Sequence, residues 1–222
     1  EYDVGGRNLL LFSDPYADHW FDDETGYLTG AGVVQVYDLD TGDFVATIDN
    51  PAPGAWELFG MGISIQDNTV YITCDGSETY TDGSGNPYSE AMYAFDASDP
   101  DPSNWTIAHT FRTPGEAQRA GGSYGHSLML HNDLLYVGAP GDDSLAEDAG
   151  AVYLFQTWTA DTADAFDGAY LETWENPTPE IGDYFGGSFA AVNGNVLISA
   201  PADKTTGVDA GSGACVEAGR SQ

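Results

Sequence analysis

Positive charge is scarce in this chain. Among its 222 residues, 5 are Lys or Arg and 36 are Asp or Glu, which gives a formal net charge of −31 at pH 7. Because a field of this sign repels phosphate backbones, the composition excludes nucleic acid as a partner. The acidic residues are spread along the chain and are not gathered in one tail, as is typical of a solvated acidic surface.

The sequence also lacks long hydrophobic runs and long stretches with helical periodicity, and it contains little cysteine. No apolar run has the length of a membrane span, so we expect no direct membrane insertion in this segment. Cysteine occurs only as Cys74 and Cys215, too few for a disulfide framework, and we expect two unpaired buried thiols. The chain instead contains short apolar runs separated by Gly, Asp, Asn and Pro, and this pattern predicts an all-β fold.

The short apolar runs belong to a unit that recurs along the chain. Each copy opens with an aromatic residue and a glycine, continues through two apolar runs joined by a polar turn, and reaches a small residue at a fixed distance. The aromatic–glycine pairs are Phe59-Gly60, Tyr124-Gly125 and Phe185-Gly186, and the small residues are Thr73, Gly138 and Ser199. In two copies the small residue is followed by alanine and proline, which gives Gly138-Ala139-Pro140 and Ser199-Ala200-Pro201.

Two further apolar runs complete each unit. A third run ends in an aromatic residue (Tyr37, Phe95 and Phe155), and a fourth ends just before a proline (Pro51, Pro114 and Pro177). Four strands per unit, repeated at a period of about sixty residues, are typical of the blades of a β-propeller. We therefore predict a single β-propeller over residues 1–222, with four-stranded antiparallel blades at 1–51, 57–114 and 122–177 and an incomplete blade at 183–222.

The repeat also predicts that the chain is a fragment. The first copy starts just after the place where its aromatic–glycine pair would stand, and the last copy stops after its third strand. About three and a half blades are therefore expected, from a range of about four to eight in known propellers. The alternative is a four-bladed ring with one defective blade.

These motifs resemble the FG-GAP repeat, the unit of the integrin alpha-subunit propeller, in the shorter variant common in bacterial and archaeal surface proteins. The pairs at Phe59, Tyr124 and Phe185 match the FG, and Gly138-Ala139-Pro140 matches the GAP. The resemblance covers nearly the whole chain. It implies a propeller, usually seven-bladed, in a secreted, cell-surface or envelope protein that serves adhesion or offers a scaffold to a protein or glycan ligand.

Calcium is the one cofactor that the resemblance suggests, because integrin-type repeats hold it in a loop between their first two strands. Here that loop is a tight turn in every copy, too short to surround calcium, so the site is not carried over. Asp142, Asp143, Glu147 and Asp148, in the loop after Gly-Ala-Pro, are candidates for weak calcium binding. Solvated loop acids are the alternative interpretation, which the irregular spacing favours.

No catalytic residue is predicted. The sequence GGSYG at 121–125 matches the G-x-S-x-G of α/β hydrolases, but that motif needs a strand-to-helix turn with His and acid partners. Because Ser123 aligns with Leu58 and Tyr184 in the other copies, we interpret the match as coincidence. We expect a non-catalytic binding module. The alternative is a propeller-fold polysaccharide lyase or hydrolase whose active residues lie partly in blades outside this chain.

Overall fold

The computed structural model describes residues 2–4, 7–20, 27–76, 91–114, 122–158, 168–204 and 211–216. Within these ranges the regular elements are β-strands and one short 3₁₀ helix, η1 (Pro102–Asn104). The strands pair in antiparallel ladders, and no sheet of the described residues closes into a barrel. The prediction of an all-β fold is confirmed. No helix in the described part of the chain has the length and hydrophobicity of a membrane span.

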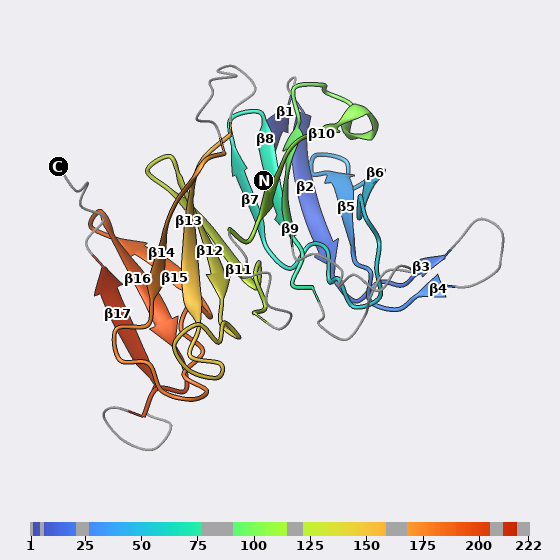
Figure 1. Cartoon of the computed structure of the whole chain (residues 1–222). Coiled ribbons are helices and arrows are strands. Elements are labelled where there is room, and N and C mark those ends of the chain that lie inside the picture. Colours follow the sequence, from blue (N-terminus) through green and yellow to red (C-terminus); the bar gives the residue numbers. More distant parts are fainter. Residues whose placement is uncertain are drawn as a thin grey trace. The chain divides into compact units, whose positions relative to one another are not determined.

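Four larger sheets follow one another along the chain (Figure 1). The first comprises β1 (Tyr2–Val4), β2 (Arg7–Asp14), β5 (Val33–Asp38) and β6 (Phe44–Asp49). The second comprises β7 (Ile63–Gln66), β8 (Thr69–Thr73), β9 (Ala91–Asp96) and β10 (Thr106–Arg112). The third comprises β11 (Ser127–His131), β12 (Leu134–Ala139), β13 (Ala151–Gln156) and β14 (Tyr170–Glu175). The fourth comprises β15 (Phe189–Val192), β16 (Asn195–Ala200) and β17 (Ser212–Val216).

Each larger sheet is a meander, in which strands adjacent in the sheet follow one another in that sheet's part of the chain. The strands of the four sheets lie within 1–51, 57–114, 122–177 and 183–222, the ranges that the repeat delimits. One further sheet is a two-stranded hairpin of β3 (His19–Trp20) and β4 (Tyr27–Leu28). This hairpin could not be predicted from the sequence, because two residues per strand are too few to show an alternating pattern.

The tight hairpin turns that the sequence predicts are present. In the fourth sheet Val192 pairs with Asn195, which leaves Asn193 and Gly194 as a two-residue turn. Their φ angles are 51° and 81°, and a type I′ turn requires a positive φ at both positions. The equivalent turn of the third sheet, between His131 and Leu134, likewise has positive φ at both central residues.

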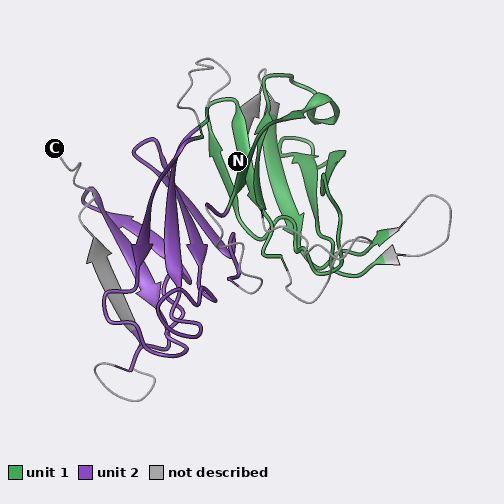
Figure 2. Cartoon of the chain, viewed as in Figure 1, with its two compact units in different colours: residues 1–112, 158–168 green, residues 113–157, 169–222 purple. Residues whose placement is uncertain are grey.

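The chain divides into two compact units, which Figure 2 colours separately. Unit 1 contains residues 1–112 and 158–168, and unit 2 contains residues 113–157 and 169–222. In unit 1 the first two sheets share a buried core that includes Val34, Val36, Phe59, Ile72 and Phe95. In unit 2 the third and fourth sheets share a core that includes Tyr136, Val152, Leu154, Phe185 and Ile198. Each unit is thus two sheets held together by apolar side chains.

Candidate functional site

The three aromatic–glycine pairs occupy the same structural position. Phe59, Tyr124 and Phe185 are all buried, with at most 1% of their surface exposed. The glycine after each has a φ between 91° and 96°, and its N–H donates to the carbonyl of the small residue thirteen positions later. These hydrogen bonds measure 2.9 Å in the second sheet and 3.0 Å in the third and fourth. The fixed spacing in the sequence therefore reflects the length of one closed hairpin.

In the second and third sheets the aromatic ring of the pair packs on the third strand of its own sheet. The Phe59 ring centroid lies 6.2 Å from that of Tyr93 and 6.3 Å from that of Phe95. The Tyr124 ring lies 5.5 Å and 6.3 Å from the equivalent rings of Tyr153 and Phe155. These motif residues thus have a packing role.

A glycine joins neighbouring sheets within each unit. Gly32 forms an isolated bridge with Phe59 in unit 1, and Gly150 forms the same bridge with Phe185 in unit 2. A Cβ on Gly150 would lie 2.1 Å from the carbonyl oxygen of Phe185, and a Cβ on Gly32 would lie 2.3 Å from that of Phe59. Only glycine allows the next sheet to approach this closely.

A buried asparagine closes each of these junctions. Asn50 and Asn176, the residues before the prolines at the ends of β6 and β14, are each 4% exposed. The Asn50 side chain donates to the carbonyl of Ala31 at 3.1 Å, and the Asn176 side chain donates to that of Ala149 at 3.4 Å. Each side-chain oxygen also accepts an N–H two residues later, at 3.0 Å. The asparagine of the Asn-Pro motif therefore caps the chain where one sheet leads into the next.

An acidic residue is buried beside each asparagine, two positions before the aromatic residue. Asp183 is fully buried and accepts from the Asn176 side chain at 2.8 Å and from the Glu180 N–H at 2.7 Å. Glu57 takes the same place in unit 1, where it is 2% exposed and bonded to the Asn50 side chain. Burial raises the pKa of Glu57 from 4.5 to about 7, although the charge of Arg112 and the hydrogen bond oppose the shift.

Glu57 belongs to a buried group of titratable side chains that also includes Cys74 and Tyr93. Burial raises the pKa of the Cys74 thiol well above its usual range, and the negative charge of Glu57 acts in the same direction. Perturbed pKa values often mark active sites. Here Cys74 is fully buried and Tyr93 is 4% exposed, so a substrate has no approach to them. The equivalent acid in unit 2 also favours a structural role for the group.

Cys74 is free and buried, as the sequence predicts. The side chain of Cys215 lies outside the described residues.

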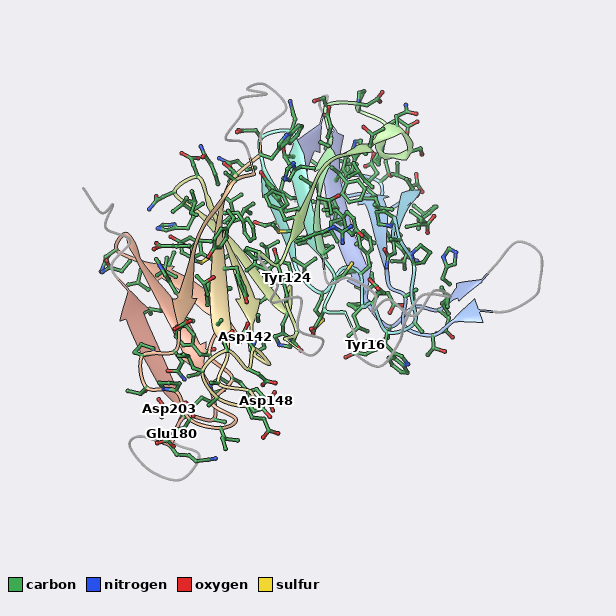
Figure 3. All side chains as sticks on the ribbon, in the orientation of Figure 1. Tyr16, Tyr124, Asp142, Asp148, Glu180 and Asp203 are labelled. Atoms are coloured by element: carbon green, nitrogen blue, oxygen red, sulfur yellow. The ribbon has the colours of Figure 1, made fainter. Side chains whose placement is uncertain are left out.

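The candidate calcium ligands lie in the loop between β12 and β13, at the end of unit 2 where Figure 3 also places Glu180 and Asp203. Asp142 is 7% exposed, and its carboxylate accepts from the Ser144 N–H at 2.8 Å and from the Tyr153 hydroxyl at 2.6 Å. The exposed Asp143 accepts from the Asp148 N–H at 2.7 Å. These two carboxylates therefore hold the shape of the loop.

The remaining candidates, Glu147 and Asp148, contribute backbone carbonyls that accept N–H groups from the turn before Phe185, at 2.9 and 3.0 Å. Their side chains are exposed and half-buried, respectively. Within the described residues, no group of three or more His, Cys, Asp or Glu side chains is placed to hold a metal ion. Weak calcium binding at this loop stays a prediction.

Ser123 is not in the setting that a hydrolase nucleophile requires. Its φ is 50°, and the chain continues through the Tyr124-Gly125 turn into β11 with no helix in between. Gly121, which opens the G-x-S-x-G match, lies outside the described residues. The equivalent residues Leu58 and Tyr184 have φ values of 51° and 56°, so this backbone conformation belongs to the repeat.

A pocket of about 560 Å³ lies in unit 2, where the loop after β12 meets the turn before β15 and the end of β16. Its polar lining comes from Ser123, His126, Asp148, Tyr184, Ser188 and Ser199, and two prolines complete the wall. The Ser188 and Ser199 hydroxyls lie 2.9 Å apart, and the Tyr184 hydroxyl lies 3.5 Å from Oδ2 of Asp148. Of these side chains, only Asp148 is a predicted ligand-binding residue; Ser199 belongs to the predicted repeat motif, and the match at Ser123 is interpreted as coincidence.

No known protein family matches this chain, and no curated protein does. Among solved structures, the crystal structure of the computationally designed Ika8 protein is similar over 80% of this chain, with a TM-score of 0.42 and 14% sequence identity. This chain spans 40% of the length of that designed protein. A similarity of this degree carries no argument about architecture or function.

Proposed function

We propose that this chain is part of an FG-GAP-type β-propeller and serves as a non-catalytic interaction module of a secreted, cell-surface or envelope protein. Its ligand would be a protein or a glycan. The larger sheets would be successive blades of a ring, about three and a half in this chain, from a protein whose remaining blades complete it.

The repeated sheet-to-sheet junction carries this proposal. Gly32 meets Phe59 in unit 1 as Gly150 meets Phe185 in unit 2, and the flanking backbone hydrogen bonds are the same in both. The Leu58 N–H donates to the backbone carbonyl of Gly30 at 3.0 Å, as the Tyr184 N–H donates to the backbone carbonyl of Asp148 at 3.0 Å. A single rule for adding the next sheet, applied repeatedly, generates a propeller or another regular array.

Two observations support a binding role over a catalytic one, and a third concerns the kind of partner. The residues that recur are engaged in packing and hydrogen bonding at the junctions, while the loops differ between copies. The raised pKa of Glu57 belongs to a side chain that is 2% exposed. The net charge of −31 favours neutral or positively charged partners over nucleic acid.

The proposal is tested by measuring binding and turnover on one preparation of the chain. Glycan and extracellular-protein arrays report retained binding, while soluble polysaccharides are assayed for new reducing ends and for the unsaturated sugars that a lyase releases. Retained binding without turnover is the expected result. Turnover without retained binding would overturn the proposal in favour of a polysaccharide lyase or hydrolase.

A further inference from the structure

The pocket of unit 2 has polar side chains that the repeat itself does not require. The junction of unit 1 has the same backbone hydrogen bonds, but Gly30 stands in place of Asp148 and Leu58 in place of Tyr184. Gly62 likewise takes the position of Ser188. The fold therefore closes this junction without a carboxylate, a phenol or a serine at these three positions.

One of these side chains occupies an unfavourable backbone conformation that unit 1 gives to a glycine. Asp148 has a φ of 53°, in the left-handed region that costs non-glycine residues roughly 1 to 2 kcal/mol. The φ of 56° at Tyr184 belongs to the repeat, since Leu58 has a φ of 51° at the same position. Glycine at position 148 would relieve this strain, as it does at position 30 of unit 1, where φ is 62°. A side chain retained in a strained position, without a requirement of the fold, is typical of functional sites, and Asp148 is such a side chain.

The chemistry of the lining favours an uncharged ligand with many hydroxyl groups. Ser123 offers a donor and an acceptor, and the hydrogen-bonded pair of Ser188 and Ser199 keeps acceptor sites and the hydroxyl hydrogen that its own bond does not use. Asp148 offers a carboxylate that can accept from two neighbouring hydroxyls. Tyr184 is 40% exposed and adds an aromatic face with a polar edge. The acidic field of the whole chain repels an anionic ligand. A cationic ligand would find only one carboxylate among these lining residues.

We propose that this pocket binds a neutral saccharide, with Asp148 and the serines contacting its hydroxyls and Tyr184 packing against a sugar ring. Its volume of about 560 Å³ is within the range of small-molecule sites, roughly 300 to 1,000 Å³. The inference rests on the proposed non-catalytic function and names the ligand class and the place where it binds.

Direct binding to the whole chain tests the inference. The probes are glucose, galactose, mannose, N-acetylglucosamine, cellobiose and lactose, with glucuronate and choline as the anionic and cationic comparisons. Saturation-transfer NMR detects weak binding, and calorimetric titration measures the affinity of the best probe. We expect at least one neutral sugar to bind and glucuronate and choline not to bind.

Variants that import residues from unit 1 locate the binding. Tyr184→Leu and Asp148→Gly introduce the residues found at Leu58 and Gly30, so both variants are compatible with the fold. Each is expected to weaken saccharide binding by roughly tenfold, the loss of one good contact. Tyr16→Leu, the same change at a tyrosine of unit 1 that is 65% exposed, is the matched control and should leave the affinity unchanged. Thermal melting of each variant verifies that it is folded.

The outcomes separate this inference from the proposed function. Saccharide binding that survives both pocket variants, binding of choline alone, or failure of every neutral sugar on the panel would overturn the inference. The proposed function would remain if the arrays still show a ligand retained elsewhere. Cleavage of a bound disaccharide would instead overturn the non-catalytic function.

Discussion

Replacing Glu57 by glutamine should stabilise the chain in a pH-dependent way. Glu57 is 2% exposed, and its pKa in the folded protein is raised from 4.5 to about 7. Between these two pH values the folded state holds this proton while the unfolded state has released it, so the contribution of Glu57 to stability falls as the pH rises. Below pH 4.5 the Glu57 carboxyl is protonated in both the folded and the unfolded state, so folding does not bury a charge there.

The magnitude follows from the two pKa values. At about 1.4 kcal/mol for each pH unit, the difference between 4.5 and about 7 costs the folded state roughly 3 kcal/mol once the pH exceeds both values. Glutamine has a similar shape, can still accept from the Asn50 side chain and carries no charge to desolvate. We therefore expect Glu57→Gln to match the original chain at about pH 4.5 and to exceed its stability by roughly 3 kcal/mol at about pH 8.

Urea unfolding followed by tryptophan fluorescence, at several pH values and one ionic strength, measures this difference. Glu180→Gln is the control for removing one negative charge from so acidic a chain, because the Glu180 side chain is exposed. A stability difference between Glu57→Gln and the original chain that does not change with pH would contradict a cost from the buried charge. So would a Glu57→Gln variant that is less stable at every pH.

Three further results are expected from the same structure. Gly150→Ala should destabilise the chain by about 3 kcal/mol or more in urea unfolding, since the new Cβ meets a carbonyl oxygen at 2.1 Å. Gly194→Ala, at a similar φ but with no neighbour within 4 Å, should cost only about 1 kcal/mol; equal losses would contradict the argument. Asn176→Ala should cost about 3 kcal/mol, because it removes a donor from a buried carboxylate; a loss below about 1 kcal/mol would contradict its capping role. In a Cys215→Ser background, Cys74 should react with a thiol reagent only after unfolding, and rapid reaction of the folded chain would show that it is accessible.

The repeat could be predicted from the sequence because its determinants are local. Alternation of apolar residues places the strands, and a turn such as Asn193-Gly194 fixes its hairpin through the φ values that it requires. The distance from each aromatic residue to its small residue is visible in the sequence. This distance is also the length of one hairpin in the structure, so the strand order within each sheet could be predicted from the sequence.

The roles of the polar residues could not be predicted in this way. Nothing in the sequence near Glu57 or Asp183 distinguishes these buried acids from the many exposed ones. Their burial depends on the asparagine that ends the preceding sheet and on how closely the two sheets approach. Similarly, Asp142 and Asp143 suggested metal ligands by their clustering, whereas their hydrogen bonds to Tyr153 and Asp148 depend on the closed shape of the loop.

Comparison between copies provides the signal that a single pass along the sequence misses. Where two copies share a residue type, as at Gly32 and Gly150, the contact geometry explains it. Where one copy has a non-glycine residue at a left-handed position that is glycine in the other copy, the contacts of the junction do not explain the difference. Asp148 keeps a left-handed backbone that Gly30 adopts without a side chain, and beside it Tyr184 replaces an aliphatic residue. Because the junction of unit 1 closes without these groups, the packing of the repeat does not explain their presence in unit 2, whereas the proposed saccharide would.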